Sequence, residues 1–219
     1  MIAETESVSV LGPDYEHMTR MSSSGGMGEL FRAHKRGLDV EVVVKRVKAQ
    51  LHGAVSETRE ANILKNLRHQ FLPRIYDIIS ASDGFIYTVM DYIPGCNLQE
   101  YVERHGALSQ AQSLKWLKQL CQVTAYLHQQ KPPVLHCDIK PQNIMITPGG
   151  DICLIDFNTS LLFENTELNA LGVTHGYAAP EQYSLTPQIL AQLPRETQAA
   201  RAAWSQAAAP YGKISERTD

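Results

Sequence analysis

The chain has 219 residues, of which 43% are hydrophobic and 20% are charged. This composition is typical of soluble globular proteins and excludes a wholly disordered chain. The net charge of −3 at pH 7 gives no overall basic footprint, so we expect no nucleic-acid partner. At about 150 residues per domain, the length predicts one large domain or two small ones.

The cysteines and the N-terminus predict a reduced, cytoplasmic protein. None of the four cysteines forms a CxxC pair, and the early acidic residues Glu4 and Glu6 do not fit a signal peptide. No apolar run approaches the ~18 residues that a membrane span needs. We therefore expect free, mostly buried thiols, a cytoplasmic location and no membrane segment in this chain.

The first 93 residues predict a mostly antiparallel sheet with one helix. Residues 10–47 are rich in strand formers, above all the β-branched run at 40–47, and a Gly/Ser-rich turn interrupts them at 22–28. Apolar residues at helical spacing predict a helix over 55–68. Two further strands are expected over 75–79 and 85–93, with a turn at 82–84 between them.

After a hinge at Pro94-Gly95 the pattern becomes mainly helical. Helices are predicted over 98–104 and 109–128, with Ser109 as the N-cap of the second. Short strands are predicted over 143–147 and 151–155, and the Ala/Gln-rich residues 185–209 are interpreted as an exposed helical insertion or a semi-ordered segment. The second helix is expected to present a broad apolar face, which consists of Leu114, Leu117, Leu120, Cys121, Ala125 and Leu127.

The residues that could carry chemistry lie between the long helix and the two short strands. Asp138, Lys140 and Asn143 occupy one predicted loop, which can direct them into one cleft. A carboxylate can orient a hydroxyl and accept its proton, a lysine can neutralise phosphate charge, and an asparagine oxygen can bind Mg²⁺. Asp156 follows the second apolar strand and adds a carboxylate suited to a metal ion that holds a polyphosphate.

These segments resemble the motifs of protein kinases. HCDIKPQN at 136–143 and LIDFN at 154–158 are similar to the catalytic loop and the metal-binding motif, written HRDxKxxN and DFG. GYAAPEQ at 176–182 resembles the APE motif in its bacterial form. SSGGMG at 23–28 resembles the Gly-rich loop, and VVK at 43–45 the VAIK strand. The resemblance, to a bacterial-type (eukaryotic-like) serine/threonine protein kinase domain, covers roughly residues 15–181.

The resemblance implies an α+β, two-lobed protein-kinase-like fold. An N-terminal extension over 1–14 would precede an N-lobe over 15–93, with an antiparallel sheet and one helix. A mainly helical and incomplete C-lobe would occupy 94–219 and contain the insertion at about 185–209. It also implies phosphoryl transfer from ATP, with Mg²⁺, to Ser/Thr hydroxyls of a protein substrate.

The resemblance also implies roles for single residues. Asp138 would orient the acceptor hydroxyl, and Lys140 would steady the γ-phosphate. Lys45 would contact the α- and β-phosphates, held by an ion pair with Glu60. The implied Mg²⁺ ligands are Asn143 and Asp156. The implied nucleotide contacts, besides Lys45, are Ser23, Gly25, Gly26, Gly28, the gatekeeper Met90, the Asp91 carbonyl and the Ile93 N–H.

The sequence departs from the family pattern at several positions. Ser23 replaces the first glycine of the phosphate loop, and Asn158 replaces the glycine of DFG. Cys137 replaces the arginine of HRD, so switching by a phosphorylated activation loop is expected to be absent. Asp219 resembles the first residue of the central C-lobe helix, so we expect a truncated domain of marginal stability.

Two alternatives stay open at this point. The departures at Ser23 and Asn158, with the early end of the chain, are compatible with a pseudokinase or a nucleotide-binding interaction module that binds ATP without turnover. A small-molecule phosphotransferase of the aminoglycoside-kinase type also carries an HxDxxxxN loop. Lys140 and the APE motif argue against that second alternative.

Overall fold

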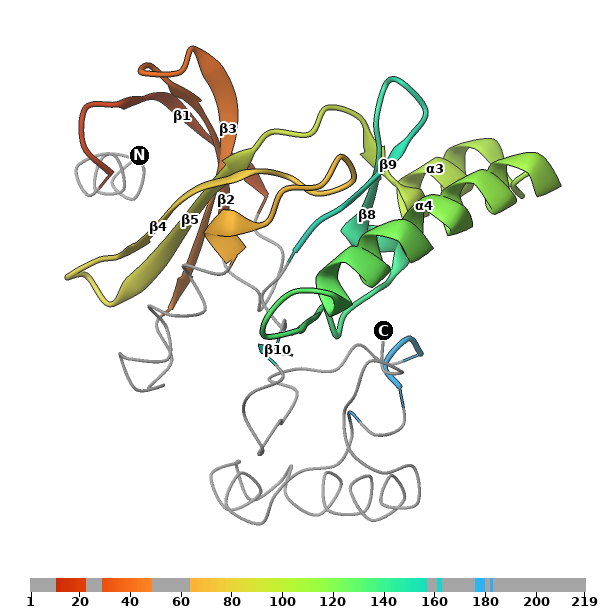
Figure 1. Ribbon diagram of the computed structural model, residues 1–219. Helices are drawn as coiled ribbons and strands as arrows, with labels where there is room; N and C mark the ends of the chain where they lie inside the picture. Colours follow the sequence, from red (N-terminus) through yellow and green to blue (C-terminus); the bar gives the residue numbers. More distant parts are fainter. Residues whose placement is uncertain are drawn as a thin grey trace, which may run out of the picture. The chain divides into compact units, whose positions relative to one another are not determined.

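Figure 1 shows the computed structural model, which describes residues 11–22, 29–48, 64–156, 161–162, 176–179 and 182. The chain divides into two compact units, Met1–Pro94 and Gly95–Asp219. The first unit holds an antiparallel sheet, and the second combines helices with short strands. The α+β class implied by the resemblance is confirmed. The proposed lobe boundaries at 93/94 stay a prediction.

The first unit contains a five-stranded sheet in the order β1-β2-β3-β5-β4, with every neighbouring pair antiparallel. The strand-rich stretch expected over 10–47 is thereby confirmed. Its central strand, β3, pairs with β2 on one side and with β5 on the other. The strands are β1 (Tyr15–Ser22), β2 (Glu29–Lys35), β3 (Val40–Lys48), β4 (Ile75–Ser80) and β5 (Phe85–Asp91).

The core of this unit follows the two-residue period of its strands. Phe31 and Ala33 of β2 are each 1% exposed, and their alternating counterparts on β3 and β5 are fully buried. Because side chains alternate between the faces of a sheet, residues next to these lie on the opposite face. The full cluster comprises Leu11, Tyr15, Phe31, Ala33, Val42, Val44, Tyr87 and Val89.

The strand predicted over 85–93 is too long, because β5 ends at Asp91. The Asp91 N–H donates to the Arg74 carbonyl, and its carboxylate accepts bonds from the Arg74 N–H and the Tyr76 hydroxyl. Pro94 has no N–H for a ladder, and Gly95 has φ +127°. These two residues therefore end the sheet and redirect the chain.

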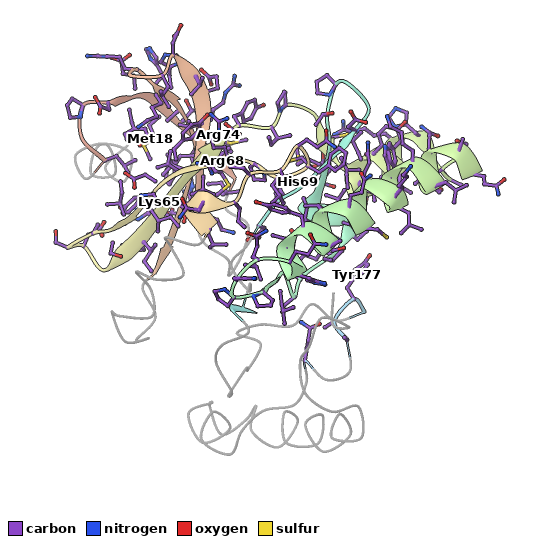
Figure 2. The ribbon with its side chains drawn as sticks, in the orientation of Figure 1. Met18, Lys65, Arg68, His69, Arg74 and Tyr177 are labelled. Carbon is purple, nitrogen blue, oxygen red and sulfur yellow. The ribbon has the colours of Figure 1, made fainter. Side chains whose placement is uncertain are left out.

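Most of the helix predicted over 55–68 lies outside the described residues. Residues 64–66 are helical and include Lys65, which Figure 2 labels. The Lys65 ammonium forms a 2.6 Å ion pair with Asp77 of β4. The Arg68 guanidinium donates to the Lys65 carbonyl. The described end of this segment is therefore attached to the edge strand of the sheet.

The second unit begins with β6 (Cys96–Asn97), α3 (Leu98–His105) and α4 (Gln110–His128). Both helices start as predicted: Asn97 caps α3, and Ser109 forms a capping box with Gln112 at the start of α4. β7 (Val134–Leu135), the 3-10 turn η1 (Pro141–Asn143), β8 (Ile144–Ile146) and β9 (Ile152–Leu154) follow. β6, β8 and β9 form one small sheet, and β7 pairs with β10 (Leu161–Leu162).

The predicted inner face of α4 is wrong in most of its positions. Leu114 and Leu117 are 59% and 58% exposed, and Cys121 and Ala125 are also exposed. The helix instead buries the stripe Trp116, Gln119, Val123 and Leu127. A glutamine belongs to that stripe because its amide finds partners in the β8–β9 hairpin, as described next.

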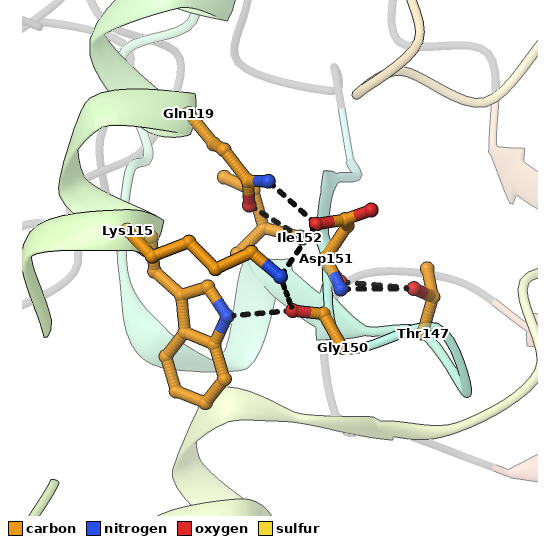
Figure 3. A network of polar contacts seen from close by, with 7 residues as sticks. Lys115, Gln119, Thr147, Gly150, Asp151 and Ile152 are labelled. Carbon is orange, nitrogen blue, oxygen red and sulfur yellow. Dashed lines mark hydrogen bonds and ion pairs between the residues drawn. The ribbon is translucent and has the colours of Figure 1, made fainter. Parts of the chain in front are cut away.

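Side chains of α4 hold the turn between β8 and β9 (Figure 3). The Lys115 ammonium and the Trp116 indole N–H both donate to the Gly150 carbonyl, at 2.8 and 3.0 Å. The Gln119 amide donates to Asp151 Oδ1 at 2.6 Å and accepts from the Ile152 N–H at 3.1 Å. These bonds fix the hairpin against the long helix.

No helix in the described part of the chain is both long enough and apolar enough to span a membrane.

Candidate active site

Three of the predicted site residues meet in one buried cluster of the second unit. Asp138, Lys140 and Asn143 are 9%, 7% and 6% exposed. Lys140 Nζ lies 2.8 Å from Asp138 Oδ2. Asn143 Nδ2 donates to the same carboxylate oxygen and to the main-chain oxygen of Asp138, both at 2.8 Å. Two donors therefore hold the Asp138 carboxylate in one orientation.

The local fold explains how residues so close in sequence converge. The turn η1 begins with Pro141, whose fixed φ suits the first position of a helical turn. The Asn143 N–H donates to the Lys140 carbonyl at 2.9 Å, which folds the asparagine back toward the loop. The loop 136–140 thus lies between the short strand β7 and a single 3-10 turn.

His136 ties this loop to the end of β9. The side chain is fully buried, and its Nδ1 accepts the Asp138 N–H at 3.3 Å. An imidazole nitrogen that accepts carries no hydrogen, so the ring proton lies on Nε2. Nε2 then donates to the Ile155 carbonyl at 3.1 Å. This geometry makes His136 a structural residue that holds the loop.

Two non-glycine residues of the site have left-handed backbone. Cys137 has φ +62° and Asp156 has φ +70°. Such a conformation costs on the order of 1–3 kcal/mol outside glycine and persists only where the surroundings enforce it. Both strained residues adjoin predicted functional positions. Cys137 directly precedes Asp138, and Asp156 is itself a predicted metal ligand.

The two predicted metal ligands lie at the open end of the β8–β9 hairpin, opposite its turn. Asn143 directly precedes β8, and the Ile155 N–H donates to its carbonyl at 2.9 Å. Asp156 is the next residue and is half-buried. Both bonds from Asn143 to Asp138 use the amide nitrogen, so the amide oxygen is the atom that Asn143 can offer a cation.

The oxygen donors of this hairpin end fit Mg²⁺. An amide oxygen and a carboxylate are hard ligands of the kind that Mg²⁺ prefers. Across the described residues, no group of three or more His, Cys, Asp or Glu side chains could enclose a metal on its own. Mg²⁺ at nucleotide sites is commonly bound by one or two protein groups and completed by phosphate oxygens and waters.

Lys45 is a buried cation in the first unit. It belongs to β3, opposite Leu30 of β2 and Thr88 of β5, and is 7% exposed. Lysines are almost never buried to this extent without a partner. Glu60, the partner predicted from the sequence, lies outside the described residues.

The predicted adenine contacts lie at the end of β5. Met90 and Asp91 close the strand, and the half-buried Ile93 follows it. The Asp91 carboxylate accepts the Tyr76 hydroxyl at 2.6 Å. Burial and this bond raise the pKa of Tyr76 above its usual 10.0. The Asp91 side chain therefore has a structural role, and only its main chain is assigned to the nucleotide.

Other predicted residues lie outside the described part of the chain. They belong to the Gly-rich loop, the helix of the first unit, the DFG-like motif and the insertion at 185–209. The site residues concerned are Ser23, Gly25, Gly26, Gly28, Glu60 and Asn158.

Gln182 is a candidate site residue that sequence reasoning missed. It is 3% exposed, and its amide donates to the Cys137 carbonyl at 2.6 Å. In the sequence, Gln182 stands out only as the last residue of the APE-like segment 176–182. A glutamine gives no signal of burial in a single sequence, and its partner lies far away along the chain.

Comparison with known proteins gives the same family as the motifs. The family model described as protein kinase domain matches residues 18–192. The serine/threonine-protein kinase PrkC of Bacillus subtilis is 32% identical over 171 residues, which are 74% of this chain and 26% of PrkC. The protein kinase kin1 of Schizosaccharomyces pombe is 30% identical over 146 residues, which are 66% of this chain and 16% of kin1.

A plant relative shows the same pattern. The CBL-interacting serine/threonine-protein kinase 8 of Arabidopsis thaliana is 35% identical over 128 residues, which are 58% of this chain and 28% of the relative. The chain therefore spans roughly a quarter or less of the length of these relatives. Because the family model covers most of the chain and the motifs lie within it, the chain belongs to the protein kinase domain family.

Proposed function

We propose that this chain transfers the γ-phosphoryl group of ATP to serine or threonine hydroxyls of a protein. The observation that carries the proposal is the buried cluster in which Lys140 and Asn143 both hold the Asp138 carboxylate. In phosphoryl transfer the protein contributes mainly positioning and charge stabilisation, and this cluster can supply both.

Asp138 orients the acceptor in this proposal. Lys140 and Asn143 fix the Asp138 carboxylate before any substrate arrives. The hydroxyl of the substrate therefore meets a carboxylate that already has a defined direction. Lys140 also brings a positive charge next to the reacting groups, where the γ-phosphate would lie. A lysine at this position resembles the Ser/Thr class of kinases, and two of the relatives above are named serine/threonine kinases.

Asn143 and Asp156 would hold Mg²⁺ through their side-chain oxygens. When bound, Mg·ATP supplies the transferable phosphoryl group, and the metal neutralises charge on the phosphates. Lys45 would bind the α- and β-phosphates, kept in place by Glu60. Ser23, Gly25, Gly26 and Gly28 would cover the phosphates with main-chain N–H groups. Met90, Asp91 and Ile93 would line the adenine site.

The proposal also includes a class of acceptor molecule and a cellular compartment. A net charge of −3 favours a protein acceptor over a nucleic acid. The cytoplasm supplies ATP and keeps thiols reduced, which suits the four cysteines of the chain, all of them free. The family membership and the APE-like segment favour a protein kinase over a small-molecule phosphotransferase.

The test is transfer of labelled γ-phosphate from Mg·ATP to a generic acceptor protein by the whole chain, followed by acid hydrolysis to identify the labelled amino acid. Phosphoserine or phosphothreonine is expected, and label on tyrosine would refute the proposed class. Asp138→Asn should lose most of the transfer. Asp39→Asn is its matched control, because the Asp39 side chain is 95% exposed and lies in a surface turn. Nucleotide binding with no transfer would replace the proposal by the pseudokinase alternative.

A further inference from the structure

Gln182 bridges two main-chain segments of the second unit that are distant in sequence. Its amide nitrogen donates to the Cys137 carbonyl at 2.6 Å, and its amide oxygen accepts the Ala179 N–H at 2.8 Å. The Gln182 N–H also donates to the Ala179 carbonyl at 3.0 Å. Gln182 is the last residue that the structure describes. Tyr177, which precedes it in the chain, is 49% exposed (Figure 2).

The bridge ends on a strained peptide of the candidate active site. Cys137 has φ +62° and lies between His136, which anchors the loop, and Asp138, which we propose orients the acceptor. A left-handed non-glycine residue needs contacts that enforce its conformation. His136 contributes on one side, through its bonds to the Asp138 N–H and the Ile155 carbonyl. Gln182 contributes on the other, by binding the Cys137 carbonyl.

Only glutamine suits this bridge. Cys137 presents a carbonyl and Ala179 an N–H, so the bridging group must donate at one end and accept at the other. Glutamate has the same length but would direct a carboxylate oxygen at the Cys137 carbonyl. Methionine fills a similar volume and makes neither bond. Since Gln182 is only 3% exposed, water would not readily replace a lost partner.

We propose that Gln182 is a positioning residue for the proposed phosphoryl transfer: it fixes the Cys137 peptide and so sets the direction of Asp138. This inference rests on the proposed function for its catalytic consequence. The bridge itself is a property of the fold and can be tested without any enzymatic activity.

The first experiment measures the reactivity of the Cys137 thiol in the whole chain. Cys137 is 4% exposed and Cys153 of β9 is 3% exposed, so both should react slowly with N-ethylmaleimide. Peptide mass spectrometry follows each thiol separately. In Gln182→Met, the rate at Cys137 should rise about tenfold, because two hydrogen bonds that keep the loop closed are lost. The rate at Cys153 should stay as in the wild type.

The matched control is Gln119→Met. Gln119 is another buried glutamine that both donates and accepts, but its partners are Asp151 and Ile152, beside Cys153. This variant should raise the rate at Cys153 and leave the rate at Cys137 unchanged. If both thiols become reactive in both variants, the effect is global unfolding and the local bridge is refuted. An unchanged Cys137 rate in Gln182→Met also refutes it.

The second experiment compares the steady-state transfer kinetics of the wild type and Gln182→Glu. A misdirected Asp138 should lower kcat about tenfold and leave the KM for ATP within about twofold. An unchanged kcat would refute the positioning role, and so would a loss confined to KM. If the wild type transfers no phosphate, the proposed function fails alone, because the thiol rates still decide whether the bridge exists.

Discussion

Asn143 holds Asp138 at two points, with its side-chain nitrogen 2.8 Å from both the main-chain oxygen and the carboxylate Oδ2 of that residue. Its own carbonyl accepts the Ile155 N–H. The asparagine thus connects the loop that carries Asp138 to the strand that leads to Asp156. A single residue, through its side chain and its main chain, links the proposed acceptor-orienting group to the proposed metal site.

Replacing Asn143 by leucine should cost both stability and activity. The substitution keeps the branched shape of the side chain but removes both donors, and a buried bond to a charged group contributes about 1.5–3 kcal/mol. We expect the free energy of unfolding in urea to fall by about 2 kcal/mol and transfer to fall at least 100-fold, on the order seen when a charge-stabilising group is lost. Gln122→Leu, at an exposed position of α4, should change neither quantity appreciably.

Lys45 offers a test that separates nucleotide binding from folding. Because Lys45 is 7% exposed and Glu60 is its proposed partner, Lys45→Met should lower the thermal midpoint, since removing one member of a buried pair leaves the other unpaired. Transfer should fall by about two orders of magnitude or more, since the charge that we assign to the phosphates is lost. A thermal melt measures the midpoint, calorimetric titration measures the affinity for ATP, and the transfer assay measures the rate. Unimpaired transfer in a folded Lys45→Met chain would remove Lys45 from the site.

Gly95 has a steric reason to be glycine. A Cβ built on it would lie 2.0 Å from the carbonyl oxygen of Ile146, and its φ is +127°. Gly95→Ala should therefore destabilise the chain by more than about 2 kcal/mol, because a backbone atom must move. Gly106→Ala is the control. Gly106 also has positive φ, +77°, but meets nothing within 4 Å, so it should cost only about 1–2 kcal/mol. Equal losses in urea unfolding would contradict the clash.

The hairpin turn predicts a dependence of stability on acid pH. Hydrogen bonds from Lys115 and then from Gln119 hold the pKa of Asp151 below its ordinary 3.8. The unfolded chain therefore binds a proton at this carboxyl more readily than the folded chain does. The contribution is fully present above about pH 4 and is lost as the pH falls through the folded pKa.

The check is the urea midpoint of the wild type and of Asp151→Asn between pH 2.5 and pH 7, values that span the ordinary pKa of about 3.8. Asp151→Asn should be less stable at neutral pH, and its stability should fall less steeply in acid. Parallel curves for the two proteins would show that the carboxylate does not contribute in this way.

The local elements could be predicted because their signals are local. Ser109 followed by Gln112 is a capping pattern, and the structure contains that capping box. The β-branched run at 40–47 forms the central strand β3. The convergence of Asp138, Lys140 and Asn143 was also foreseeable, because eight consecutive residues carry the whole motif.

Features that depend on distant partners could not be predicted from one sequence. Hydrophobicity alone predicts Leu114 and Leu117 on the inner face of α4, but both are exposed. Burial of Gln119 depends on bonds to the β8–β9 hairpin, which no helical periodicity reveals. Gln182 was missed for the same reason, since its partner is the Cys137 carbonyl.

The most direct test of the central claim is the single-turnover rate of phosphoryl transfer in the wild type and in Asp138→Asn, with ATP affinity measured on the same samples. The Asp138 carboxylate should matter for the transfer step and not for binding the nucleotide. We predict that Asp138→Asn transfers at least about 100-fold more slowly and binds ATP with an affinity within about twofold of the wild type. Equal transfer rates in the two proteins would contradict the account.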